Sequence, residues 1–167
     1  MNRSIGIIVL LLVAWALFTQ QAPVSADKKP VLAFTPLEPG GVDKYDAGVV
    51  SQQLRKEIDA AGVYKTVEFS EIELRLAEQN LPPRCADVQT AVMIGQILGA
   101  DFVGIGSIDR IGKSYAISMQ IVEVRSGRII NNTSEFYKGN FRKFQTIIVP
   151  YFARKMSGLP VDEPKKK

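Results

Sequence analysis

The sequence contains no histidine and only one cysteine, Cys85. The lack of histidine excludes Ser-His and Cys-His nucleophilic sites and every metal site with imidazole ligands. One cysteine cannot form a disulfide within the chain, and no D-x-D or E-x-x-H pattern indicates a metal constellation. Glu71 and Glu73 are two residues apart on an expected helix, so they point to different faces and form no acid–base pair. We therefore expect no catalytic residue, no bound metal and no cofactor, and hence a protein that is not an enzyme.

Basic residues are not concentrated on any internal segment. Lys28, Lys29 and the three lysines at 165–167 lie at the two ends, whereas the sequence between them is close to neutral. A nucleic-acid-binding surface requires lysine and arginine clustered along one element, so we expect no nucleic-acid partner.

Long hydrophobic runs are also scarce, and the only one is residues 5–18. This run is shorter than the roughly 20 residues that cross a bilayer. A positive start precedes it, and Val24, Ser25 and Ala26 follow as small residues at a cleavage site. The pattern predicts a signal peptide over residues 1–26, cleaved after Ala26, and a soluble periplasmic or secreted protein without an integral membrane segment. An uncleaved N-terminal anchor is the alternative.

Hydrophobic periodicity predicts one α/β (α+β) domain over residues 27–160, followed by a disordered basic tail over residues 161–167. The order is β-α-β-α-α-β-β-β-α, which indicates a mixed sheet of about five strands with helices packed on it. The expected strands are residues 31–37, 63–69, 102–108, 115–124 and 129–137, and the expected helices are residues 47–61, 70–79, 85–98 and 141–156.

Local signals set the ends of these elements. Gly62 follows the first helix as a left-handed cap, and Ser70 with Glu73 forms a capping box for the second. Short glycine-containing joints between the last three strands predict consecutive antiparallel hairpins. Pro150 should kink or break the last helix. The apolar stripe of that helix is interpreted as its core face, with a partner-binding or membrane-surface face as the alternative.

Four glycines lie in the stretch IGQILGADFVGIGSI, residues 94–108. A dinucleotide fingerprint lies between a strand and a following helix, but here a helix ends and a strand begins, and Asp109 stands where the third glycine belongs. We interpret the glycines as structural. Gly99 is the helix C-cap, Gly95 permits close helix packing, and Gly104 with Gly106 lets a helix approach one strand face.

The segment IGQILGADFVGIGSIDRIGKSYAISMQIVEVRSGRII, residues 94–130, resembles the signature of a bacterial cell-envelope family. The family includes the periplasmic domain of CsgG, the N-terminal domain of TolB and the penicillin-binding-protein activator LpoB, as well as small stand-alone members. The matching positions include Ile94-Gly95, Leu98 to Asp101, Gly106-Ser107, Gly112, Tyr115 and Gly127. The resemblance runs from the first strand to about Gly158 and implies the fold of this family.

The departures from the family limit what the resemblance implies about function. The sequence has no lipid-accepting cysteine, no long barrel-forming insertion as in CsgG and no propeller as in TolB. What the resemblance implies is a non-enzymatic periplasmic domain that binds an envelope or secretion protein. A small-ligand-binding or enzymatic role, in a cleft beside the carboxyl ends of the strands, is the alternative. The partner and the oligomeric state, including a homo-oligomer, stay open.

Cys85 is the one candidate for thiol chemistry. The favoured interpretation is burial of Cys85 as a small apolar side chain. The alternative is a free reactive thiol or an intermolecular bond, since a position at a helix start lowers a thiol pKa.

Overall fold

The computed structural model describes residues 28–83, 85 and 87–164. The expected signal peptide, its cleavage site at Ala26 and residues 165–167 of the tail lie outside the described residues. Residues 161–164 form neither helix nor strand. None of the helices in the described part of the chain is long and apolar enough to cross a bilayer.

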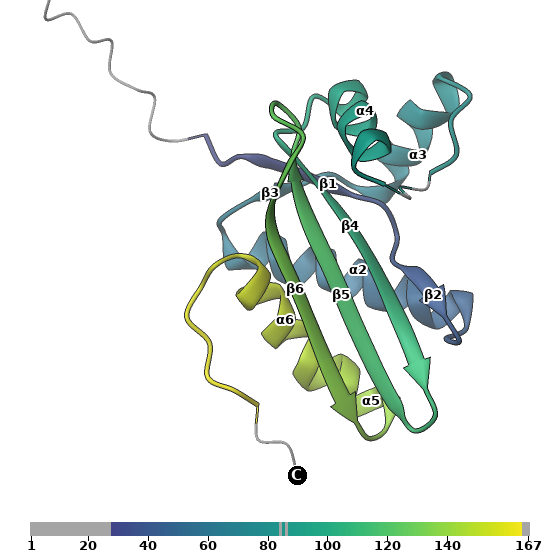
Figure 1. Ribbon diagram of the computed structural model, residues 1–167, viewed down its shortest axis with the longest axis vertical. Coiled ribbons are helices and arrows are strands. Elements are labelled where there is room, and N and C mark those ends of the chain that lie inside the picture. Colours follow the sequence, from purple (N-terminus) through teal and green to yellow (C-terminus); the bar gives the residue numbers. More distant parts are fainter. Residues whose placement is uncertain (1–27, 84, 86, 165–167) are drawn as a thin grey trace, which may run out of the picture.

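The fold is a mixed sheet with helices packed on it, as the sequence predicted (Figure 1). The order along the main path is β3-β1-β4-β5-β6. The first three of these strands are parallel, whereas β4, β5 and β6 form the two predicted antiparallel hairpins. The strands are β1 (Val31–Phe34), β2 (Glu38–Gly40), β3 (Lys65–Thr66), β4 (Phe102–Ile111), β5 (Ser114–Glu123) and β6 (Arg128–Lys138).

A short strand that the sequence did not predict makes the sheet six-stranded. The expected first strand ended at residue 37, but residues 38–40 pair as β2 with β4, placing Glu38 opposite Ser107. The chain leaves β1 at Phe34, and the Leu37 backbone N–H donates to the Ser51 hydroxyl at 2.9 Å. This contact with a distant helix directs the next residues along β4.

Helices cover both faces of the sheet. Behind the sheet in Figure 1 lie α2 and α6, and α3 and α4 pack together at the upper end. Gly95 of α4 faces Val103 and Val124, whereas Gly104 faces Phe34 on the other side of the sheet. The core therefore has two layers of side chains, one on each face. The helices are α2 (Lys44–Ala61), α3 (Phe69–Glu78), α4 (Val88–Leu98), α5 (Phe141–Lys143), the π-helical turn η1 (Phe144–Ile148) and α6 (Val149–Met156).

The last helix is interrupted at the expected place, but by a π-helical turn. Pro150 occupies the first turn of α6, where its missing N–H is tolerated, and η1 precedes it. The apolar stripe of this segment packs in the core: Phe144, Ile148, Phe152 and Met156 are buried. The core interpretation of the stripe is therefore confirmed.

The predicted starts of the first three helices are wrong, and α2 begins at Lys44 instead of residue 47. Helix α3 begins at Phe69 after an N-cap at Glu68, so Ser70 lies inside the helix and caps nothing. Packing fixes this start, because Phe69 meets the Phe34 ring edge-on at 5.4 Å and Arg55 forms an ion pair with Glu68. The expected strand over residues 63–69 is also shorter than predicted, since β3 has only two residues. Helix α4 begins at Val88, three residues after Cys85.

Candidate functional site

The glycine-rich stretch forms the passage from α4 into β4. Gly99 ends α4 in the left-handed conformation (φ 61°), and its N–H donates to the carbonyl groups of Gly95 and Gln96. A Cβ on Gly104 would lie 2.8 Å from the Phe34 Cβ, and one on Gly106 would lie 2.5 Å from the Ser118 carbonyl oxygen. The nearest atoms to these two glycines belong to β1, to the residues after it and to β5, and none belongs to a helix. The fourth glycine, Gly95, lies against the valines described above.

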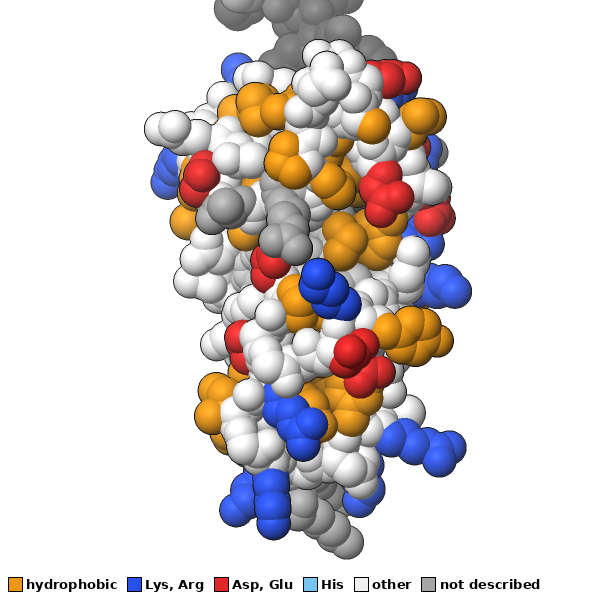
Figure 2. Space-filling view, turned by 90° about the vertical axis from the view of Figure 1, so that its right-hand side faces the viewer, with side chains coloured by type: hydrophobic (Ala, Val, Ile, Leu, Met, Phe, Trp, Pro, Cys, Tyr) orange, Lys and Arg blue, Asp and Glu red, His pale blue; other side chains and the backbone are white. Residues whose placement is uncertain are grey.

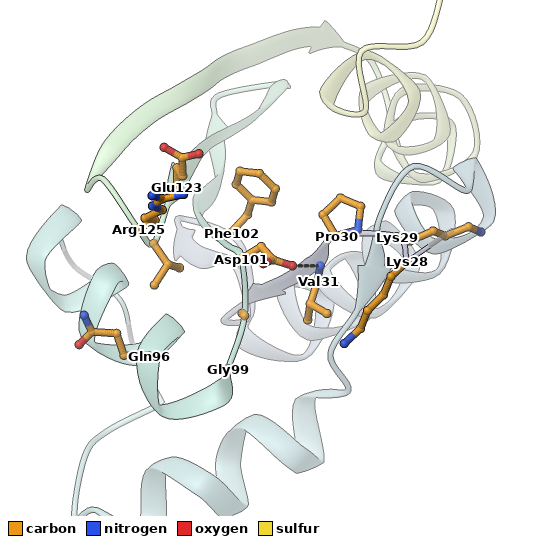
Figure 3. Close-up of a pocket in the computed structure, with 12 residues that line it drawn as sticks. Lys28, Lys29, Pro30, Val31, Gln96, Gly99, Asp101, Phe102, Glu123 and Arg125 are labelled. Carbon is orange, nitrogen blue, oxygen red and sulfur yellow. Dashed lines mark hydrogen bonds between the residues drawn. The ribbon is translucent and has the colours of Figure 1, made fainter. Parts of the chain in front are cut away.

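A polar cleft of about 710 Å³ adjoins this passage at the amino ends of β1 and β4 (Figure 3). Asp101 points to the start of β1, where its carboxylate accepts a 2.7 Å hydrogen bond from the Val31 N–H. Glu123 lies beside Arg125 and accepts a hydrogen bond from the Ser126 hydroxyl. The Asp101 carboxylate therefore stabilises the start of β1, and the Glu123 carboxylate stabilises the turn after β5.

The position of this cleft also differs from the one expected for a ligand site. The alternative interpretation of the sequence placed a ligand cleft beside the carboxyl ends of the strands, as is usual for open α/β sheets. At the carboxyl end of β1 the structure has a cleft of about 210 Å³, which includes Leu37 and three prolines, and Pro36 also lines the larger groove described below. Across the described residues, no group of three or more His, Cys, Asp or Glu side chains could hold a metal ion.

Cys85 is a buried free thiol, 3 % exposed, within the hydrophobic core. Burial, together with the nearby negative charge of Asp87, raises the pKa of the Cys85 thiol to about 11. Asp87 itself caps α4: its carboxylate accepts from the Thr90 N–H at 2.8 Å, which lowers the pKa of Asp87. Because the thiol lies before the helix rather than in it, the helix start does not activate it. The buried position agrees with the interpretation of Cys85 as a small apolar side chain rather than with the alternative of a reactive thiol.

A more apolar groove of about 630 Å³ runs along the exposed side of α2. We call it the α2 groove; its lining includes Pro36, Tyr45, Gly48, Val49 and Phe69. The Tyr45 side chain is 78 % exposed, although an aromatic ring of this size gains free energy from burial. Lys44, Lys56 and Glu73 supply the charged groups at its margin.

Sequence reasoning missed the α2 groove. The buried face of α2 gave the clear signal, since Ala47, Val50, Leu54 and Ile58 recur at helical spacing. Tyr45 and Val49 are also four residues apart and therefore share a helix face. This pair on the opposite face was the available signal for an exposed apolar site.

Comparison with known proteins places the chain in a family. The family model DUF3280, described as "Protein of unknown function (DUF2380)", matches residues 43–145. The chain belongs to the DUF3280 family. Among curated proteins, none matches this DUF3280 chain.

Several solved structures of bacterial proteins share this fold. The LpoB C-terminal domain from Salmonella enterica is 20 % identical, with a TM-score of 0.57, over 76 % of this chain and 93 % of that domain. The lipoprotein GNA1162 from Neisseria meningitidis is 14 % identical, with a TM-score of 0.59, over 77 % of this chain and 96 % of that one. TolB from Acinetobacter baumannii is 17 % identical, with a TM-score of 0.53, over 81 % of this chain but 30 % of TolB.

At these low identities, the similarity shows a shared fold but not a shared function. The LpoB and TolB parts of the predicted resemblance are confirmed at the level of the fold. The CsgG part stays a prediction.

Proposed function

We propose that this DUF3280 protein is a non-enzymatic, periplasmic protein-interaction domain that serves envelope assembly or secretion. The α2 groove is the docking site for its partner. The observation that carries this proposal is the exposure of Tyr45 beside Val49 on a helix whose other face is fully packed.

The chemistry of the α2 groove indicates the kind of partner that fits. Tyrosine is enriched at binding hot spots because it offers a large, rigid contact area with few rotatable bonds. The floor is open at Gly48, where a Cβ would meet nothing within 4 Å. Lys44 and Lys56 lie at the margin, with Glu73 as the only acidic side chain in the lining. A protein segment with an apolar side chain for the floor and an acidic residue beside it would complement this surface.

The structural neighbours support the proposed setting. LpoB, the Neisseria lipoprotein and TolB are envelope proteins that share this fold, and a signal peptide over residues 1–26 would deliver the chain to the same compartment. The carboxylates in the polar cleft are occupied by the start of β1 and the turn after β5, which favours binding over catalysis.

The test compares two variants that remove an exposed apolar side chain from a helix. Tyr45→Ser changes the α2 groove, and Met93→Ser changes α4, where Met93 is 40 % exposed. Photo-crosslinking in intact cells, followed by capture, should give one envelope partner with the wild type and with Met93→Ser. Its yield should fall at least tenfold with Tyr45→Ser, because a hot-spot truncation costs about 2 kcal/mol.

Equal yields from the two variants would contradict docking at the α2 groove. The small-ligand alternative has its own test at the polar cleft. A metabolite that raises the melting temperature of the wild type, with the rise abolished by Arg125→Gln, would replace the proposed function with ligand binding.

A further inference from the structure

The end of the molecule opposite the start of β1 has a distinct surface. It consists of residues 110–114 around the β4–β5 turn and residues 138–143, which run from the end of β6 through α5, and we call it the hairpin end. Both segments lie at the lower end of Figure 1. The Gly139 N–H donates to the Lys113 carbonyl at 3.3 Å, and Ser114 pairs with Lys138 across the strands. The two segments therefore form one platform.

The hairpin end carries cations and no acidic residue. Its five cations are Arg110, Lys113, Lys138, Arg142 and Lys143, and all five are exposed. Within the described residues, no carboxylate forms an ion pair with any of them. On the face seen in Figure 2, lysine and arginine side chains gather at the lower end, and the acidic side chains lie above them.

An apolar side chain protrudes among these cations. Ile111, the last residue of β4, is 64 % exposed at the tip of the hairpin. On the other face of the hairpin lies a cleft of about 490 Å³ that includes Tyr115 and Phe141, whose rings are 5.3 Å apart. The Arg110 guanidinium lies over the Tyr115 ring, 5.9 Å from its centroid. This aromatic packing holds the end of the hairpin against α5.

We propose that the hairpin end docks on an anionic phospholipid bilayer, with Ile111 entering the interface and the cations contacting headgroup phosphates. A protruding apolar tip surrounded by cations suits a broad, yielding anionic surface, which can take the tip and reach every cation at once. An acidic protein segment would engage the cations but would leave Ile111 without an apolar partner. The hairpin end shares no residue with the α2 groove, so the two proposals are independent.

A fluorescence experiment tests the depth of the tip. Trp15 is the only tryptophan of the sequence, so the full chain with Trp15→Phe can carry a reporter at one chosen site. The reporters are Ile111→Trp at the tip and, as the matched control, Ile129→Trp on β6, where Ile129 is 46 % exposed. With vesicles of phosphatidylglycerol, the reporter at position 111 should shift to the blue and be quenched by brominated lipid, and the control should change little.

A charge experiment tests the electrostatic part. Each cation near an anionic surface contributes about fivefold to partitioning, so Lys113→Gln with Lys138→Gln should weaken vesicle binding about 25-fold. Lys65→Gln with Arg75→Gln removes two exposed cations elsewhere and should leave binding within about twofold. High salt and phosphatidylcholine vesicles should each abolish the difference between the two double variants.

Three outcomes would overturn the proposal. Equal quenching at positions 111 and 129 would show unspecific adsorption or anchoring by another segment. Equal loss in the two double variants would show that overall charge alone is responsible. A response of the reporter at position 111 to polyglutamate but not to vesicles would assign the surface to an acidic protein segment.

Discussion

Gly48 and Gly106 both lie inside regular elements, yet their surroundings differ completely. A Cβ on Gly106 would lie 2.5 Å from the Ser118 carbonyl of the neighbouring strand, whereas one on Gly48 would point into open space. The passage from α4 to β4 is thus a region where glycine makes room for close packing. The α2 groove is a region where glycine leaves a surface hollow. The conspicuous glycine-rich stretch is architecture, and the surface suited to binding carries no motif.

The largest expected effect is at Gly106. Gly106→Val should lower the free energy of unfolding by about 3 kcal/mol or more, because the clash is with backbone that cannot move alone. Urea denaturation monitored by circular dichroism measures this loss. A decrease in the free energy of unfolding below about 0.5 kcal/mol, as is usual for surface substitutions, would contradict the close packing around Gly106 and its contrast with Gly48.

The pH dependence of stability tests whether the Cys85 thiol is buried just before α4. The pKa of the Cys85 thiol in the folded state, about 11, lies above the ordinary value of 9.0. The unfolded state therefore releases the thiol proton more easily than the folded state does. The stabilisation of the folded state by the protonated thiol is complete below pH 9 and is lost as the pH rises from about 9 to about 11. The loss in the free energy of unfolding is at most about 2–3 kcal/mol. Urea denaturation across this window should show a steeper fall for the wild type than for Cys85→Ala. Parallel curves would contradict the buried protonated thiol, as would an oxidised dimer on non-reducing gels.

At Gly99, in the same passage, a side chain would be disfavoured by the backbone conformation and not by a steric clash. Nothing lies within 4 Å of a Cβ at this position, but its φ of 61° disfavours side chains. Gly99→Val should therefore cost about 1–2 kcal/mol, and Gly99→Asn less, since asparagine tolerates the left-handed region. Thermal unfolding of the two variants checks the order. A neutral Gly99→Val would mean that the α4 cap contributes little to stability.

The effect at Gly48 should have the opposite sign. Gly48→Ala replaces glycine inside α2 without a clash and should raise the free energy of unfolding by about 0.5–1 kcal/mol. The added methyl group also fills part of the α2 groove, so capture of the partner should weaken while stability rises. A stabilised variant with undiminished capture would exclude the floor at Gly48 from the docking site.

The smallest expected effect is that of nucleotides. ATP, GTP or NAD should leave the melting temperature unchanged, since a ligand that binds only the folded state must raise it. A rise of several degrees that Gly104→Val abolishes would revive phosphate binding by the glycine-rich stretch.

Much of the sheet could be predicted because its signals are local. Gly112 and Gly127 both have the left-handed φ angles of tight turns, and the alternation of side chains sets most of the faces of β4, β5 and β6, except at the register shift between Ile121 and Val122. The start of α3 could not be predicted in this way. The Ser70–Glu73 pattern is a sound local signal, but contacts of Phe69 with Phe34 and of Glu68 with Arg55 overrode it.

The sequence by itself determined the alternation of elements, the hairpins, the end of α4 at Gly99 and the absence of histidine chemistry. Each depends on residue type or on neighbours within a few positions. Only the tertiary structure decided that residues 38–40 join β4, that Cys85 is buried and that Tyr45 and Ile111 stay exposed. These features depend on which distant segments come together, because burial and strand pairing arise from contacts between residues far apart in the chain.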